Sequence, residues 1–260
     1  MDLGTRPAIV MEGITVSVTP DPASAGREAG VAAAASIAAA TRRQGSARVI
    51  FASAPSQEAM LAELISAADI DWAKVQAFHM DEYVGLPAQH PQAFGQWLEE
   101  RLASVDIGSF ERIDPSEDPA REARRYAALI AAGPVDVVCM GIGVNGHIAF
   151  NEPDATRFDD PDRVRVVELD AESRKQQVDD GLFPGIDDVP TEAVTLTVPA
   201  LLAAREVVVT VLGERKAPAV SAALAGPVGP HCPASAIRSH RSARVFLDRA
   251  AAARLPARPR

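Results

Sequence analysis

The sequence predicts a doubly wound α/β fold, Rossmann-like, in which one domain holds a mainly parallel sheet with helices on both faces. Apolar runs of strand length alternate with helical segments along the whole chain, as expected when crossover helices join parallel strands. The 260 residues are 47% hydrophobic, which is enough for a large core, and no change of composition marks a linker. We expect one domain over residues 1–253, followed by a disordered tail, 254–260, that contains two prolines and three arginines.

Strands are expected where aliphatic residues form short runs, and the run at 135–140 is the strongest. The predicted strands are 47–52, 75–78, 135–140, 164–169, 194–198, 206–212 and 244–248. Helices are expected where the pattern has a helical period or is rich in alanine. The predicted helices are 23–41, with Gly30 as a poor helix former, 57–66, with Ser56 as its N-cap, 94–102 and 122–132.

Charge and cysteine content exclude several classes of protein. A net charge of −9 leaves no broad basic surface, so neither nucleic acid nor an anionic membrane is expected as a partner. There is no signal peptide pattern, and no apolar stretch approaches the ~20 residues of a membrane span, so we expect a cytoplasmic protein. The two cysteines, Cys139 and Cys232, form no metal-binding pattern, so neither a disulfide framework nor a metal site is expected.

Three polar clusters follow predicted strands, at 53–57, 81–83 and 141–152. Ligands of parallel sheets bind beyond the carboxyl ends of the strands, so these clusters are the candidate site. In the second cluster, Asp81 and Glu82 are neighbours and point to different sides, so only one of them is expected to face a substrate. The alternative for this cluster is a capped turn with solvated acids.

The third cluster begins with Gly141-Ile-Gly-Val-Asn-Gly146, which matches the G-x-G-x-x-G pattern of dinucleotide sites. That pattern should open a helix, but Pro153 and Pro161 would break one, so a nucleotide site is disfavoured. We expect instead that the glycines, Gly143 and Gly146 among them, let the backbone approach a small ligand closely.

His147 follows this loop directly, and Glu152 comes five residues later. A carboxylate near an imidazole can fix its tautomer and raise its pKa, which suits a group that moves protons near neutral pH. The spacing does not match a zinc motif. A structural histidine is the alternative, but the position after a strong strand and a glycine-rich turn favours a functional one.

These segments resemble the glucosamine-6-phosphate deaminase and isomerase family, whose members share a fold with 6-phosphogluconolactonases. The segments that carry the resemblance are F-H-M-D-E-Y-V-G-L-P from Phe78, G-I-G-V-N-G-H-I-A-F-N-E-P from Gly141 and V-L-G-E-R-K-A from Val211. The N-E-P run favours the deaminase side, because lactonases have a different sequence after the Gly-His pair. The resemblance implies that an amino-sugar phosphate such as glucosamine 6-phosphate is converted to fructose 6-phosphate and ammonia, without metal or organic cofactor.

The resemblance also implies roles for residues at matching positions. Asp81 would move a proton between C2 and C1, His147 would open the sugar ring, and Glu152 would orient His147. Asn145 belongs to the same catalytic set but stands where many members have an aspartate, so it lacks the charge that would support the histidine. Lys216 would contact the phosphate. Substrate contacts are further implied for Ser53, Ser56, Glu82, Gly143, Gly146 and Arg174.

The sequence departs from the family pattern where phosphate would bind. The first phosphate loop of the family is glycine-rich, whereas this chain has Ser53-Ala-Pro-Ser56-Gln57. An acid, Asp179, falls near the position of the family's phosphate-binding arginine, and Arg174 could substitute from one turn earlier. We therefore expect the proton chemistry to be retained while the group bound at the far end can differ from a plain 6-phosphate.

The remaining alternatives are a lactone hydrolase, in which His147 would activate water, and a non-catalytic sugar sensor. Ammonia release distinguishes the deaminase from both. The expected partner is a small sugar substrate, and the expected assembly is a monomer or a small homo-oligomer.

Overall fold

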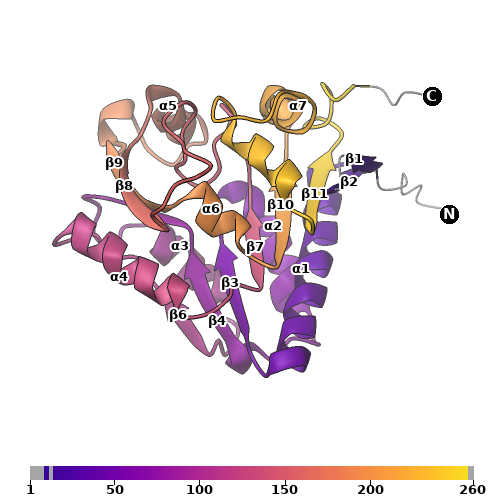
Figure 1. Cartoon of the computed structure of the whole chain (residues 1–260), viewed down its shortest axis with the longest axis horizontal. Helices are drawn as coiled ribbons and strands as arrows, with labels where there is room; N and C mark the ends of the chain where they lie inside the picture. The colour runs from indigo at the N-terminus through magenta and orange to yellow at the C-terminus, as the bar shows by residue number, and fades with distance from the viewer. Residues whose placement is uncertain (1–8, 12–13, 257–260) are drawn as a thin grey trace.

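The main sheet has the parallel strand order expected of a doubly wound fold (Figure 1). The computed structural model describes residues 9–11 and 14–256. Over these residues the order is β1-β2-β11-β10-β7-β3-β4-β6, and all neighbours are parallel except β1 and β2. The strands are β1 (Ile9–Met11), β2 (Ile14–Thr19), β3 (Ala47–Phe51), β4 (Val75–His79), β6 (Ser109–Glu111), β7 (Val137–Met140), β10 (Glu206–Val211) and β11 (Ala243–Asp248).

Helices cover both faces of this sheet, as predicted. They are α1 (Pro22–Gln44), α2 (Glu58–Ser66), α3 (Phe94–Leu102), α4 (Pro119–Ala131), α5 (Ala171–Asp179), α6 (Val198–Leu202) and α7 (Ala217–Ala225), with short 3₁₀ segments η1 (Pro55–Gln57), η2 (Trp72–Lys74), η3 (Ile186–Asp188), η4 (Glu214–Lys216) and η5 (Pro233–Ser239). Figure 1 shows α4 and α6 on one side of the sheet and α1 and α2 on the other.

Alternate residues of the central strands enter two different cores, because successive side chains of a strand point to opposite faces. Val138 and Met140 of β7 belong to the core beneath α4, α6 and α7. Val137 and Cys139 of the same strand belong to the core beneath α1, α2 and α3. A strand buried on both faces must be apolar throughout, which is why β7 was the strongest strand signal in the sequence.

Helix α1 owes its length to caps and to small residues at its contact with α2. The side chain of Asp21 accepts a hydrogen bond from Ser24 N at the N-terminus, and Gly45 ends the helix with φ +82°. A Cβ on Gly30 would lie 2.6 Å from the Cβ of Glu63 on α2. Gly30, the poor helix former within this segment, therefore allows the two helices to pack closely.

A second, three-stranded antiparallel sheet was not expected. It consists of β5 (Asp81–Tyr83), β9 (Glu192–Leu196) and β8 (Val164–Glu168) in that order. We expected the segments of β8 and β9 to belong to the parallel sheet. That expectation is wrong, because β9 pairs antiparallel with β5 on one side and with β8 on the other. The predicted strand 194–198 is also too long, since Val198 is the first residue of α6.

The small sheet and α5 lie beyond the carboxyl ends of the parallel strands, at the top in Figure 1. They have an apolar cluster of their own, which includes Tyr83, Phe94, Phe150 and Phe183. This unit supplies one wall of the site described below.

No helix within 9–11 and 14–256 is long and apolar enough to cross a membrane. At the C-terminus, Leu255 packs against the main core. Of the predicted tail 254–260, residues 257–260 lie outside the described residues.

Candidate active site

A pocket opens where the parallel strands end, between the loops after β3, β4 and β7 and helix α5. All three polar clusters of the sequence contribute to it. Its polar and aromatic lining residues are Ser53, Ser56, Asp81, Phe94, His147, Phe150, Gln176, Gln177, Asp180 and Lys216, with Gly141 and Gly143 in its floor. The predicted meeting of separate loops at one edge of the sheet is thus observed.

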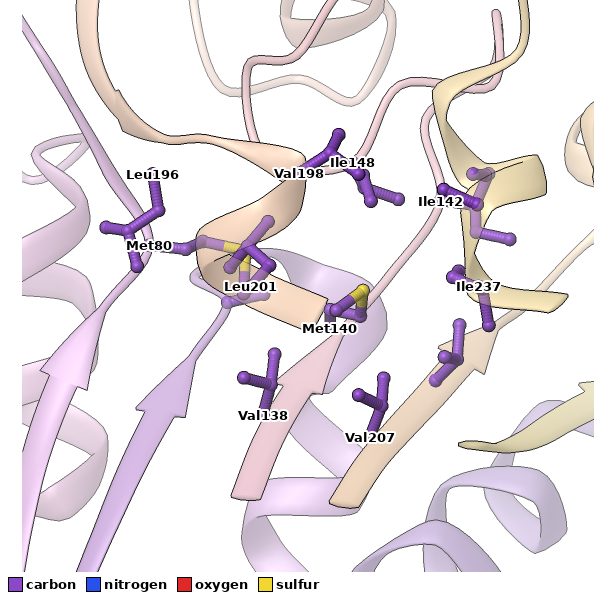
Figure 2. Packing of buried hydrophobic residues seen from close by; sticks show 14 of the residues in the cluster. Met80, Val138, Met140, Ile142, Ile148, Leu196, Val198, Leu201, Val207 and Ile237 are labelled. Atoms are coloured by element: carbon purple, nitrogen blue, oxygen red, sulfur yellow. The ribbon is translucent and has the colours of Figure 1, made fainter. Parts of the chain in front are cut away.

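Apolar neighbours hold the lining residues in place (Figure 2). Met80, Ile142 and Ile148 alternate with the polar residues in sequence, are at most 4% exposed, and belong to the same core cluster. Figure 2 shows these side chains among those of Met140 and Leu201 beneath the loops. Because these anchors fix the backbone, the adjoining residues Asp81 and His147 face the pocket from rigid supports.

Two glycines of the loop make room for neighbouring side chains. The Cβ of any residue at Gly143 would overlap the imidazole ring of His147, which lies directly over this glycine. Gly146 has φ +90°, and a Cβ there would lie 2.8 Å from Cys232 Sγ. Gly143 lines the pocket, whereas Gly146 shapes the turn before His147.

Asp81 and Glu82 point to different sides, as expected for neighbours in a strand. Asp81 lines the pocket and is 6% exposed. Burial, and secondarily the nearby charge of Glu82, raises the pKa of Asp81 well above its usual value. Its carboxylate is therefore a strong base for an acid side chain.

Glu82 is engaged by the protein backbone. Its carboxylate accepts hydrogen bonds from the amides of Tyr83 (3.0 Å), Phe94 (3.0 Å) and Gly95 (2.8 Å). Helix α3 has no side-chain cap of its own, so Glu82 satisfies its N-terminal amides. Glu82 does not line the pocket, so the substrate contact expected for it is not part of the proposed site.

His147 reaches Glu152 through a third residue, Ser173 of α5. The distance from His147 Nδ1 to Glu152 Oε2 is 3.6 Å, too long for a hydrogen bond. Ser173 Oγ lies 2.9 Å from His147 Nδ1 and donates to Glu152 Oε2 at 2.9 Å. Ser173 is fully buried.

Asn145 joins this network from the opposite side. Its amide nitrogen donates to Glu152 Oε2 (3.0 Å) and to Asp170 Oδ2 (2.9 Å), and its carbonyl oxygen accepts from the backbone amide of His147 (3.0 Å). Asp170 also caps α5, because its other oxygen accepts from Ser173 N at 2.7 Å. The carboxylate of Asp170 thus lies next to the uncharged side chain of Asn145.

Burial shifts the two titrating groups of this network in opposite directions. It lowers the pKa of His147 to about 3, with the charge of Lys216 as the second cause. It raises the pKa of Glu152 to about 7, against the hydrogen bonds from Ser173 and Asn145. The expectation that Glu152 raises the pKa of His147 is therefore wrong, because burial outweighs a carboxylate that does not touch the ring.

Comparison with known proteins assigns this chain to a family. The sequence profile described as glucosamine-6-phosphate isomerases/6-phosphogluconolactonase matches residues 20–246. The chain belongs to this family. A glucosamine-6-phosphate deaminase of Rhodopirellula baltica is 38% identical over 204 residues, which cover 76% of this chain and 79% of that protein. One of Listeria monocytogenes is 34% identical over 208 residues, covering 79% and 86%.

Solved structures of the glucosamine-6-phosphate isomerase/6-phosphogluconolactonase family have the same fold. A monomeric glucosamine-6-phosphate deaminase superimposes with a TM-score of 0.83 at 28% identity, covering 92% of this chain and 99% of that one. A 6-phosphogluconolactonase from Trypanosoma brucei superimposes with a TM-score of 0.76 at 21% identity, covering 97% and 100%. The second likeness shows the fold alone.

The end of the pocket where the family resemblance placed phosphate has few positive charges. Among its described lining residues, Lys216 is the only lysine or arginine, and Asp180 stands in the same wall. Burial lowers the pKa of Lys216 to about 8, although Asp180 acts in the opposite direction. Ser53 and Ser56 line this end, where Ser53 Oγ donates to Phe94 O at 3.0 Å.

Arg174 lies away from the pocket. Its guanidinium donates to the carbonyl oxygens of Ile186 (2.6 Å) and Val189 (3.0 Å), so it fastens η3 to α5. Asp179 is paired with Lys175 (2.6 Å) and Arg215 (2.9 Å) outside the lining. Arg174 is therefore not part of the phosphate end of the pocket. The acid that lines the pocket is Asp180 and not Asp179.

Sequence reasoning missed the contribution of α5. Ser173, Gln176, Gln177 and Asp180 follow the i, i+3, i+4, i+7 spacing of one helix face, and this face is turned to the site. The face is polar because it lines a pocket, so the segment has no apolar stripe. The available signal was Asp170 followed three residues later by Ser173, a typical helix start.

The glycine-rich loop is followed by a turn and a β-bridge between Ile148 and Asn151, and the next helix is α5. It thus lacks the helix that a dinucleotide site would require. Within the described part of the chain, no cluster of three or more His, Cys, Asp or Glu residues is arranged to hold a metal ion.

Proposed function

We propose that this protein is an aldose-ketose isomerase and deaminase that converts an amino-sugar phosphate such as glucosamine 6-phosphate to fructose 6-phosphate and ammonia. The observation that carries the proposal is that Asp81, the first residue of β5, and His147, in the loop after β7, line one pocket. The relatives named glucosamine-6-phosphate deaminases support it. From the sequence we predict that the protein acts in the cytoplasm as a monomer or small homo-oligomer.

Each group has a role that follows from its surroundings. His147 transfers the proton that opens the cyclic sugar at its ring oxygen. The carboxylate of Asp81 removes the proton from C2 and delivers it to C1, while a proton of the 2-amino group passes to O1; this leaves an imine at C2 that water converts to the ketone and ammonia. Exclusion of water around the buried Asp81 makes its ionised form a better base than a solvated aspartate.

Release of ammonia tests the proposal. The purified protein is assayed with glucosamine 6-phosphate, its 2-epimer and 4-epimer, unphosphorylated glucosamine and 6-phosphogluconolactone. Ammonia together with a ketose phosphate is the expected result. Loss of the lactone without ammonia would contradict the proposal in favour of lactone hydrolysis, and binding without turnover would favour a sugar sensor.

The far end of the substrate is the second part of the proposal. With Lys216 opposed by Asp180, this end holds a phosphate dianion less firmly than a site with several cations would. We therefore propose a modest preference for the phosphorylated sugar. Comparing kcat/KM for glucosamine 6-phosphate and glucosamine tests this, and a preference of many thousandfold would contradict it.

Replacing Lys216 by glutamine is expected to raise KM for glucosamine 6-phosphate about 10-fold to 100-fold, because a charge-assisted hydrogen bond contributes ~1.5 to 3 kcal/mol. In the wild-type protein, KM should rise with pH above about 8, where Lys216 loses its proton. Initial rates measured from pH 6.5 to 9.5 check both expectations. The matched control is Lys175→Gln, which removes an exposed lysine on α5 and should leave KM nearly unchanged. An unchanged KM in Lys216→Gln would contradict the role.

A further inference from the structure

Ser173 occupies a position between His147 and Glu152 that a purely structural serine would not need. Its hydroxyl is within 2.9 Å of both His147 Nδ1 and Glu152 Oε2, and it is fully buried. The two outer groups do not bond to each other, since they are 3.6 Å apart. Ser173 Oγ therefore connects the two groups by hydrogen bonds, and a proton can pass between them through it.

We propose that Ser173 relays a proton between His147 Nδ1 and Glu152 Oε2, so that the neutral imidazole of His147 acts in turn as base and as acid. This inference rests on the proposed function, because it assigns the relay to the ring-opening step. Ser173 is a positioning residue, since it acts on the substrate only through His147.

The relay has two end states, and the second holds one proton more than the first. When Glu152 is ionised, Ser173 donates to Glu152 Oε2 and accepts from His147 Nδ1–H, so His147 Nε2 presents a lone pair. When Glu152 is protonated, it donates to Ser173, Ser173 donates to Nδ1, and Nε2 carries the hydrogen. Nδ1 is engaged in both states, which leaves Nε2 for the substrate.

Protons balance in the ring-opening step. His147 Nε2 takes the proton of the anomeric hydroxyl while Nδ1–H passes to Ser173 Oγ and the hydroxyl hydrogen of Ser173 passes to Glu152. The reverse movement delivers a proton from Nε2 to the ring oxygen as the C1–O bond of the ring breaks. The enzyme ends as it began, and imidazolium is never formed.

Avoiding imidazolium matters here because of the surroundings. His147 is buried and has Lys216 on its substrate side, so a second positive charge is strongly disfavoured. Glu152 has Asn145 and Asp170 on one side, and Asp160, Arg165 and Glu168 around the cavity on its other side. Burial raises the pKa of Glu152 to about 7 against the hydrogen bonds from Ser173 and Asn145, so both of its protonation states are accessible near neutral pH.

The first test is kinetic. Ser173→Ala should lower kcat of ammonia release about 100-fold with KM within about 3-fold, and Ser173→Thr, which restores a hydroxyl, should recover most of kcat. The pH profile of kcat should lose its inflection near 7 in Ser173→Ala. The matched control is Ser36→Ala, which removes a buried serine hydroxyl of α1 and should leave kcat unchanged. A Ser173→Ala protein with wild-type kcat and pH profile would overturn the relay.

The second test needs no turnover. With ¹⁵N-labelled histidine, the ring nitrogens of His147, assigned by their loss in His147→Gln, should report the Nε2–H tautomer below about pH 7 and the Nδ1–H tautomer above it. In Ser173→Ala, this change of tautomer should disappear. If it persists, or if wild type shows no change, the relay is wrong. Absence of ammonia release by wild type would instead refute the proposed function, and the tautomer measurement would still decide on the relay.

Discussion

Replacing Asp81 by asparagine is expected to lower kcat for ammonia release about 10³-fold or more, with little change in KM. An amide has nearly the size of the carboxylate but cannot accept the C2 proton, and general base catalysis contributes ~10² to 10⁴-fold. The measurement is the initial rate of ammonia release from glucosamine 6-phosphate. Loss of C2 hydrogen exchange with solvent deuterium should accompany it. A variant that keeps a tenth of the wild-type rate would show that another residue is the base.

The same substitution should leave the protein as stable as before, or more stable. Burial raises the pKa of Asp81, so ionising it costs free energy in the folded state. A carboxyl with a raised folded pKa contributes its stability at low pH and loses it as pH rises through that pKa. At pH 8 the asparagine variant should therefore unfold at or above the wild-type temperature. For wild type, kcat/KM should fall as pH is lowered and Asp81 becomes protonated.

Glu82→Gln is the matched control for Asp81→Asn, because it changes the adjacent acid in the same way. An amide nitrogen would face backbone amides that now donate to Glu82. We expect a loss of stability of about 1 to 3 kcal/mol, since these donors lose a charged acceptor, and a much smaller effect on kcat. The pair thus separates a catalytic acid from a structural one.

His147→Gln is expected to lower kcat about 10² to 10⁴-fold by blocking the opening of the sugar ring, while Asp81→Asn leaves that step intact. The exchange between the two anomers of glucosamine 6-phosphate measures ring opening directly by NMR saturation transfer. Wild type and Asp81→Asn should accelerate it, whereas His147→Gln should not. Acceleration by His147→Gln would mean that the ring is opened by another group.

Residues that follow strongly apolar strands could be placed from the sequence alone. Asp81 follows the end of β4 by two residues and His147 follows β7 after the glycine-rich loop, and parallel strands end at one edge of a sheet. Their convergence on a pocket was therefore predictable. That only one of Asp81 and Glu82 faces the pocket also had a sequence basis, since neighbours in a strand face opposite sides, but only the structure shows that Glu82 caps α3.

Residues of α5 could not be placed in this way. The inward face of this helix carries Ser173, Gln177 and Asp180, so it lacks the apolar stripe that identifies a helix packed on a core. Arg174 is one residue from Ser173, which turns it about 100° around the helix axis and away from the pocket. In a helix whose Ser173 side is turned to the site, Arg174 is excluded from the pocket lining, whereas Asp180, seven residues after Ser173, is expected in it.

The sequence by itself determined the alternation of strands and helices, the two-faced core and the position of Asp81 and His147 beyond the ends of apolar strands. These follow from short-range periodicity and from the position of polar residues after apolar strands. The tertiary structure alone decided that Ser173 bridges His147 and Glu152, that Asn145 donates to Asp170, and that Asp180 lines the same pocket as Lys216. The physical reason is that the small antiparallel sheet, whose pairing of β5 with β9 is set by long-range contacts, carries α5 over the ends of the parallel strands.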